Sequence, residues 1–218
     1  MAIASDAREV ALNRRDALTG VRNLVVDLPA DVQQQVFGRA KGFVLGEQDG
    51  SYLDDEVTGT PHPLSSFKTS MGSASLRGEA LLLAAASATT PEDHAWVRDQ
   101  AIGLLSSGDI VDVHAAAVTL SRLPRDVAAE VDANLMVSHG HVGVRQASAV
   151  LCLRQPARCR DAAMRLAQDS EYRVRRTLAE AAARADPEAS ELATEILERL
   201  ARDPRHSVRV AARPSRHE

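Results

Sequence analysis

An apolar residue followed directly by a basic residue recurs along the chain at intervals long enough for two helices. An alanine follows each pair within a few positions. The five pairs are Leu76-Arg77, Val113-His114, Val144-Arg145, Val174-Arg175 and Val208-Arg209, with intervals of 37, 31, 30 and 34 residues. A repeat length of about 20–50 residues is typical of architectures that stack one supersecondary unit on the next. The recurrence therefore predicts an array of helical pairs.

Segments with helical spacing, separated by short polar breaks, fill the chain from about residue 74 onward. Thr90 and Pro91 indicate one helix start, since threonine is a good N-cap and proline suits the first helical position. Nothing in this region alternates with the period of a strand, so the expected fold class is all-α. The expected helices cover 73–88, 92–107, 109–123, 125–139, 142–154, 157–168, 171–185 and 188–201, with a last one after Asp203-Pro204.

The repeated pattern resembles the HEAT-repeat family, in which Asp-Pro at a turn precedes Val-Arg and small residues on the second helix. Asp203-Pro204 with Val208-Arg209 matches this signature most fully, and Asp169 with Val174-Arg175 matches it without the proline. In the other three repeats His139, Gly108 and Met71 stand at the aspartate position. The resemblance covers about residues 74–213 and implies an α-solenoid in which aspartate and arginine pair between neighbouring repeats. The residues it places in this ladder are Arg77, Arg145, Asp169, Arg175, Asp203 and Arg209.

Three regions are expected. Residues 1–45 form an N-terminal helical pair that caps the array, with Val32, Val36 and Phe37 facing inward. Residues 46–73, rich in glycine, proline, serine and threonine, form an irregular connector. Residues 74–218 form the HEAT-like array. It stops partway through a repeat at "VRVAARPSRHE", so we expect a partner or self-association at that end.

Composition limits the function. The net charge of −4 argues against a general nucleic-acid binder, and with 3% aromatic residues the core is built from alanine, leucine and valine. No segment has the length and apolarity of a transmembrane helix or a signal peptide. Cys152 and Cys159 have no metal-type spacing, which favours a reduced, cytoplasmic setting. Abundant alanine and arginine with only two lysines suggest a bacterial protein.

A basic face is expected on the second helices, which line the concave side in HEAT-like arrays. Residues 140–218 hold 15 arginines against 11 acidic residues. The candidate binding residues are Gln146, Arg154, Arg173, Arg176, Glu180 and Arg184. The alternative for the helix 171–185 is a solvated face with pairs four residues apart, such as Arg176–Glu180.

The sequence contains no catalytic or metal-binding motif with a clear spacing. His139 and His141 lie two apart at a turn without a clear third ligand, and His217-Glu218 is the only His-Glu pair. No nucleophile elbow, phosphate-binding glycine loop or dinucleotide fingerprint is present. We expect no metal, no cofactor and no enzymatic activity.

The expected function is that of a non-catalytic binding scaffold. It holds a protein partner, such as an acidic segment or another subunit, on a curved helical-repeat surface. The alternative is a nucleic-acid-binding protein similar to the HEAT-like glycosylases of DNA-alkylation repair. That resemblance would use Trp96 and Asp99, which share one helix face.

Overall fold

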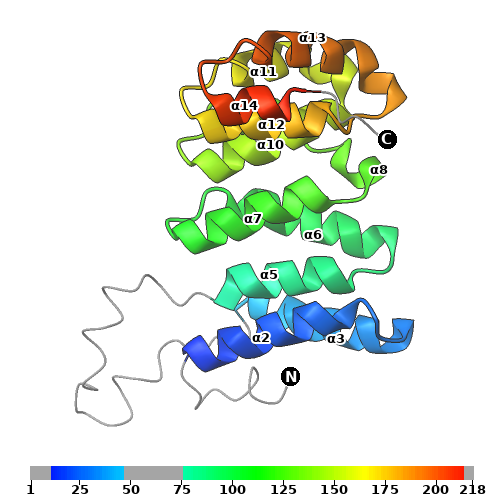
Figure 1. Cartoon of the computed structure of the whole chain (residues 1–218). Helices are drawn as coiled ribbons and strands as arrows, with labels where there is room; N and C mark the ends of the chain where they lie inside the picture. Colours follow the sequence, from blue (N-terminus) through cyan, green and yellow to red (C-terminus); the bar gives the residue numbers. More distant parts are fainter. Residues whose placement is uncertain (1–10, 47–75, 214–218) are drawn as a thin grey trace, which may run out of the picture. The chain divides into compact units, whose positions relative to one another are not determined.

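The structure is a computed structural model that describes residues 11–46 and 76–213. Within these residues it contains helices and turns and no strand, so the expected all-α class is confirmed (Figure 1). No helix in the described ranges combines the length and apolarity needed to cross a membrane. The expected connector lies outside the described residues except for Gly46. The chain divides into two compact units, residues 1–119 and 120–218, and this boundary lies inside the segment expected as one array.

The first unit begins with a helical pair packed on the next helix along the chain. Helices α2 (Ala11–Val25) and α3 (Ala30–Val44) both contact α5 (Leu76–Ser87). The apolar positions of α3 recur at helical spacing, and Val36, Phe37 and Phe43 are buried, whereas Val32 is half-buried. Glu79 of α5 accepts hydrogen bonds from Arg22 Nη1 (2.9 Å) and Thr19 Oγ1 (3.2 Å). Polar and apolar contacts therefore both hold the pair on α5.

One further helix and most of another complete this unit. Helix α6 (Pro91–Leu104) begins as the sequence predicts, because Thr90 accepts from the Asp93 N–H and Asp93 accepts from the Thr90 N–H in a capping box. Helix α7 (Ile110–Arg122) approaches α5 closely at Gly78. A Cβ atom at Gly78 would lie 3.1 Å from the Ala115 Cβ.

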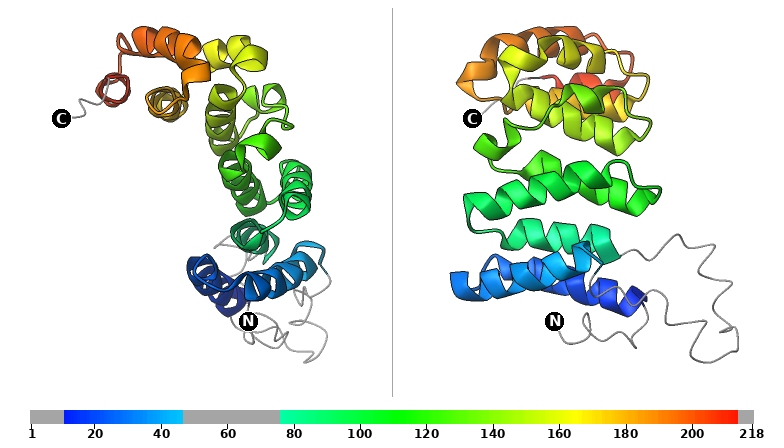
Figure 2. Two further views of the ribbon diagram at one scale, coloured as in Figure 1. Left: turned by 90° about the vertical axis from the view of Figure 1, so that its right-hand side faces the viewer. Right: turned by 180° about the vertical axis from the view of Figure 1, so that it is seen from behind.

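In the second unit the helices form two layers (Figure 2). Helices α10 (Val142–Arg154), α12 (Tyr172–Ala182) and α14 (His206–Ala211) lie side by side in one layer. Helices α11 (Pro156–Leu166) and α13 (Ser190–Leu200) form the other, with the short 3-10 helix η1 (Pro187–Ala189) leading into α13. The repeated valines Val144, Val174 and Val208 are fully buried. Each of them therefore places the arginine that follows it at the edge of this core.

The prediction of a single helix at 125–139 is wrong. The structure has two short helices there, α8 (Arg125–Ala128) and α9 (Asn134–Val137). Between them the Asp132 carboxylate accepts the Asn134 N–H at 3.0 Å, a local bond that competes with helix continuation. From the end of α10, Gln155 Nε2 donates to the carbonyls of Ala128 (2.7 Å) and Val131 (3.0 Å). The Ala128 carbonyl also accepts the Val131 N–H at 3.1 Å, so a short turn and a distant side chain both bind it where the helix breaks.

Candidate functional site

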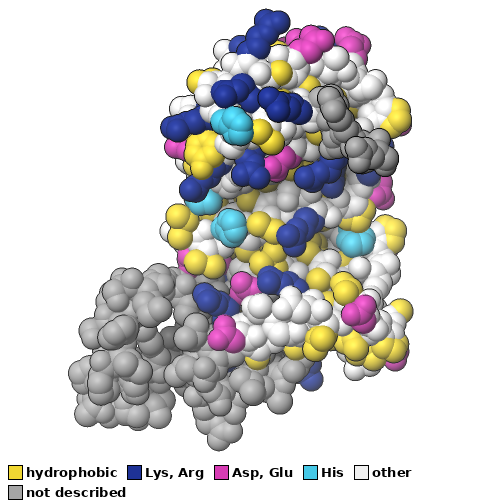
Figure 3. Space-filling view, in the orientation of Figure 1, with side chains coloured by type: hydrophobic (Ala, Val, Ile, Leu, Met, Phe, Trp, Pro, Cys, Tyr) yellow, Lys and Arg dark blue, Asp and Glu magenta, His cyan; other side chains and the backbone are white. Residues whose placement is uncertain are grey.

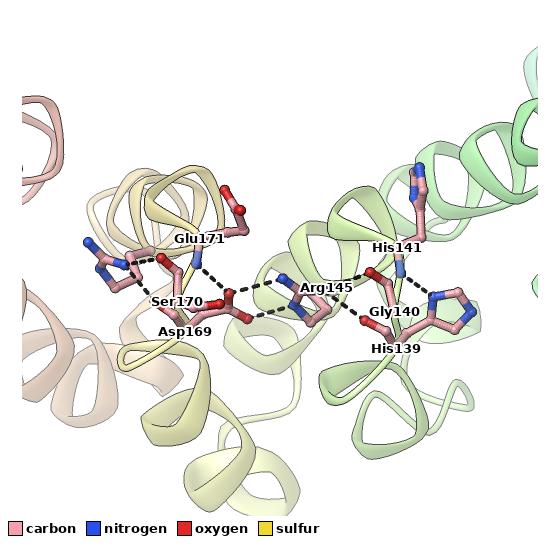
Figure 4. A network of polar contacts seen from close by, with 8 residues as sticks. His139, Gly140, His141, Arg145, Asp169, Ser170 and Glu171 are labelled. Atoms are coloured by element: carbon pink, nitrogen blue, oxygen red, sulfur yellow. Dashed lines mark hydrogen bonds and ion pairs between the residues drawn. The ribbon is translucent and has the colours of Figure 1, made fainter.

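The same arginine arrangement occurs three times along the layer of α10, α12 and α14. In each copy Nη1 of the arginine donates to the two carbonyls that lie six and five residues before it. Arg145 binds the carbonyls of His139 (2.8 Å) and Gly140 (3.1 Å), as Figure 4 shows. Arg175 binds those of Asp169 and Ser170, and Arg209 binds those of Asp203 (2.7 Å) and Pro204 (2.9 Å). Each arginine therefore closes the turn that precedes its own helix.

Two of these arginines also bind the aspartate of the following turn. Arg145 Nε and Nη2 donate to Asp169 Oδ2 and Oδ1 at 2.7 and 3.1 Å. Arg175 holds Asp203 in the same way, at 2.6 and 3.2 Å. Bidentate pairs of this kind fix orientation as well as charge. Both pairs are largely shielded from solvent, with exposed fractions of the side chains between 4% and 13%.

These pairs join α10 to the turn before α12, and α12 to the turn before α14. The structure thus brings together four of the residues expected in the ladder: Arg145, Asp169, Arg175 and Asp203. Arg209 lies in the third copy, where its Nη1 donates to the carbonyls of the turn before α14. Arg77 lies exposed on the first turn of α5, in the other unit.

The turn before α10 uses a histidine where the other two use an aspartate. Nδ1 of His139 accepts the His141 N–H at 3.0 Å (Figure 4). Asp169 accepts the Glu171 N–H at 2.9 Å and Asp203 accepts the Arg205 N–H at 2.8 Å, both from the same relative position. The imidazole therefore replaces the carboxylate in closing the turn. The sequence pattern did not predict this role, since it treats His139 as a departure from the motif.

The ladder carboxylates are held in their charged form. Burial would raise the pKa of Asp203, but the hydrogen bonds from Arg175 and the Arg205 N–H, with the charges of Arg175 and Arg209, lower it below the usual value. The pKa of Asp169 is lowered in the same way, against burial, chiefly by Arg145. These hydrogen bonds in turn raise the pKa of the Arg145 and Arg175 guanidinium groups.

The outward face of α12 carries exposed arginines. Arg173 and Arg176 lie on α12, on the side opposite the buried Val174 and Leu178, and the exposed Arg184 lies in the turn that follows the helix. On this face Arg176 Nε binds Glu180 Oε1 at 2.7 Å, a pair within one helix of the kind expected for a solvated face. Figure 3 shows that basic side chains outnumber acidic ones on the surface over α12 and α14.

Arg205 adds to this basic face from the turn before α14. Its guanidinium carbon lies 5.6 Å from the centre of the Tyr172 ring, and that of Arg173 lies 6.0 Å from the same ring. The two cations therefore flank one aromatic side chain at the start of α12. The sequence analysis did not select Arg205 or Tyr172. Their positions in the sequence could have indicated this contact, because Tyr172 is the first residue of α12 and Arg205 directly precedes α14.

The other two residues expected on this face have internal partners. Gln146 Nε2 donates to Thr177 Oγ1 at 2.9 Å, which links α10 to α12. Arg154 Nη1 donates to the Leu123 carbonyl at 2.6 Å. Burial lowers the pKa of Arg154, with Asp186 opposing this shift. Both side chains thus support the layer, and the exposed charge of the face comes from α12 and the turn before α14.

Trp96 and Asp99, the residues of the glycosylase alternative, lie on α6 in the first unit. The Trp96 ring packs edge-to-face on Phe37 of α3, with centroids 5.7 Å apart, and Lys41 Nζ lies 4.9 Å from the centre of the indole. The Asp99 carboxylate binds Arg98 at 2.8 Å and is 60% exposed. Packing between α3 and α6 thus accounts for the position of the indole. Among the described residues no group of three histidine, cysteine or acidic side chains is arranged to hold a metal.

No protein-family model matches the chain. A search of curated proteins likewise finds no match.

Proposed function

We propose that the chain is an α-solenoid of HEAT-like repeats that serves as a non-catalytic binding scaffold. On this proposal the layer of α10, α12 and α14 receives an acidic segment of a protein partner. The observation that supports it best is the outward face of α12 and the turn after it, where Arg173, Arg176 and Arg184 are exposed and Glu180 is the acid beside them.

Two further observations support a preformed surface. The ladder pairs fix the spacing of the three helices, so the arginines are presented on a rigid support. The layer of α11 and α13 has mixed charge, because Arg160 of α11 pairs with Glu191 and Glu195 of α13. An acidic partner is therefore attracted more strongly to the layer of α10, α12 and α14 than to the other layer.

The test is the affinity of a fluorescein-labelled peptide rich in glutamate and aspartate, measured by anisotropy at low and moderate salt. The triple variant Arg173→Glu, Arg176→Glu, Arg184→Glu should weaken binding by about tenfold or more, because three exposed attractions become repulsions. A matched control reverses Arg165, Arg199 and Arg202, which are exposed on or next to α11 and α13. It should change the affinity by less than about twofold.

Equal losses of peptide affinity in the two triple variants, or no peptide binding by the wild-type protein, would contradict the proposal.

The alternative function is tested with a DNA duplex as a second probe. Tighter binding of the duplex than of the peptide, with a steep salt dependence, would favour nucleic-acid recognition. If alkylated DNA were processed and Trp96→Ala and Asp99→Ala abolished this activity, the glycosylase-like function would replace the scaffold.

A further inference from the structure

The ladder arginines each use two separate edges of the guanidinium group. Nη1 closes the arginine's own turn, and the edge formed by Nε and Nη2 binds the aspartate of the next turn. The first edge holds the side chain in place, so the second edge points in a fixed direction. Such a fork has a geometry that matches one carboxylate.

Arg209 repeats the first half of this arrangement. Its Nη1 donates to the carbonyls of Asp203 (2.7 Å) and Pro204 (2.9 Å), the same relative partners as in Arg145 and Arg175. Within the part of the chain that the structure describes, no carboxylate forms an ion pair with its Nε and Nη2 edge. Arg209 is half-buried, and the next residue of α14, Val210, is 48% exposed. Arg209 is therefore preorganised, and an exposed apolar residue follows it on α14.

The two filled copies show what kind of group this edge accepts. In both, the carboxylate belongs to an aspartate that also accepts the N–H two residues later and stands in the turn before a helix. The negative charge then lies near the positive end of that helix as well as near the arginine. An aspartate in such a turn presents both oxygens toward the arginine of the preceding helix.

We propose that Arg209 is the docking point for a partner helix that has an aspartate in its N-terminal turn. The aspartate binds Nε and Nη2 of Arg209, and the first turns of the partner helix pack along α14 beside Val210. This site lies at the edge of α14 and uses one oriented carboxylate. It does not depend on the arginine face of α12 proposed above for an acidic segment.

A peptide from this chain provides the probe. Residues 167–184 contain the Asp169 turn and helix α12, the segment that Arg145 holds inside the molecule. The peptide has four arginines and three acidic residues. Charge alone therefore does not draw it to the basic face of α12, and the two proposals can fail independently. A fluorescein label allows its binding to the full-length protein to be followed by anisotropy.

The wild-type protein should bind this peptide, and Arg209→Gln should weaken binding by about tenfold, the effect of losing a bidentate charged pair. Arg209→Lys should lose most of the affinity, because an ammonium group cannot form the parallel pair of bonds. Arg213→Gln, at an exposed arginine on the next turn, is the matched control and should bind as the wild type does.

The peptide can be changed as well, which leaves the protein intact if Arg209→Gln disturbs α14. A peptide with Asp169→Asn should bind about tenfold more weakly to the wild type and show little further loss with Arg209→Gln. The proposal is overturned if the wild type does not bind the peptide or if Arg209→Lys retains full affinity. It is also overturned if the loss of affinity from Arg209→Gln in the protein and the loss from Asp169→Asn in the peptide are additive.

Discussion

At the scale of single residues, Asp203 joins two functions in one carboxylate. It closes the turn before α14 through the Arg205 N–H and neutralises Arg175 of the preceding helix. Only 4% of its side chain and 11% of that of Arg175 are exposed. Loss of the carboxylate would leave a nearly buried guanidinium without its counter-charge, which is a more costly change than the loss of a surface ion pair.

Asp203→Ala should therefore lower the free energy of unfolding by about 3 kcal/mol, as measured by urea titration followed by circular dichroism. Asp186 offers a matched control, since it also precedes a proline and binds an arginine, Arg125, at 2.8 Å. That pair is exposed (44% and 54%), so Asp186→Ala should cost less than about 1 kcal/mol. Similar costs for the two variants would show that the ladder does not contribute as a buried pair.

The ladder also predicts how stability depends on pH. Because the folded pKa values of Asp169 and Asp203 lie below those of the unfolded chain, their contribution is complete above about pH 4 and is lost as the pH falls through the folded values. The melting temperature of the wild type should therefore fall below about pH 4. In Asp203→Ala this acid-induced fall should be smaller, because one of the depressed carboxylates is gone. Parallel curves would contradict this assignment.

At the scale of helices, the sequence predicted elements better than it predicted their junctions. Apolar spacing and caps locate α6, α10 and α12 within a few residues of their observed bounds. The break between α8 and α9 was missed because it depends on Gln155, whose partners lie 24 and 27 residues away along the chain. Local spacing carries no signal of such a contact.

The candidate site shows the same limit. The motif pattern selected Asp169 and Asp203, whose role follows from residue type and position. It could not predict that the imidazole of His139 would accept the same turn hydrogen bond, because this depends on the ring's orientation. Arg154 has the spacing of an exposed position on α10. Its bond to the Leu123 carbonyl becomes visible only when the end of α7 is placed.

Close packing of α5 on α7 depends on Gly78. An added Cβ would already lie 3.1 Å from the Ala115 Cβ and 3.3 Å from the Val111 carbonyl oxygen, so the larger side chain of Gly78→Val has to displace α7. This variant should lose about 1–3 kcal/mol of unfolding free energy in urea titration.

Gly38, in the middle of α3, has no atom within 4 Å of an added Cβ. Gly38→Ala should therefore stabilise the protein by up to about 1 kcal/mol, because alanine has the higher helix propensity. If Gly78→Val were neutral, α5 and α7 would not be packed as closely as the structure shows.

At the scale of the whole molecule, each compact unit carries its own natural probe. Trp96, the only tryptophan, lies in the first unit, and both cysteines, Cys152 and Cys159, lie in the second. Both thiols are buried and form no disulfide. A hydrogen bond with Cys159, together with burial, raises the pKa of the Cys152 thiol, so this thiol reacts slowly until the second unit opens.

On the proposed repeat architecture, stability is approximately a sum of terms for each repeat and for neighbouring repeats, so a local defect acts most strongly near its position. We expect Asp203→Ala to shift the urea midpoint for cysteine alkylation further than the midpoint for Trp96 fluorescence. Gly78→Val, in the first unit, should produce the opposite order. Identical shifts of the two probes in both variants would mean that the units unfold as one cooperative body. The difference between the two midpoints therefore measures how far the two units unfold independently of each other.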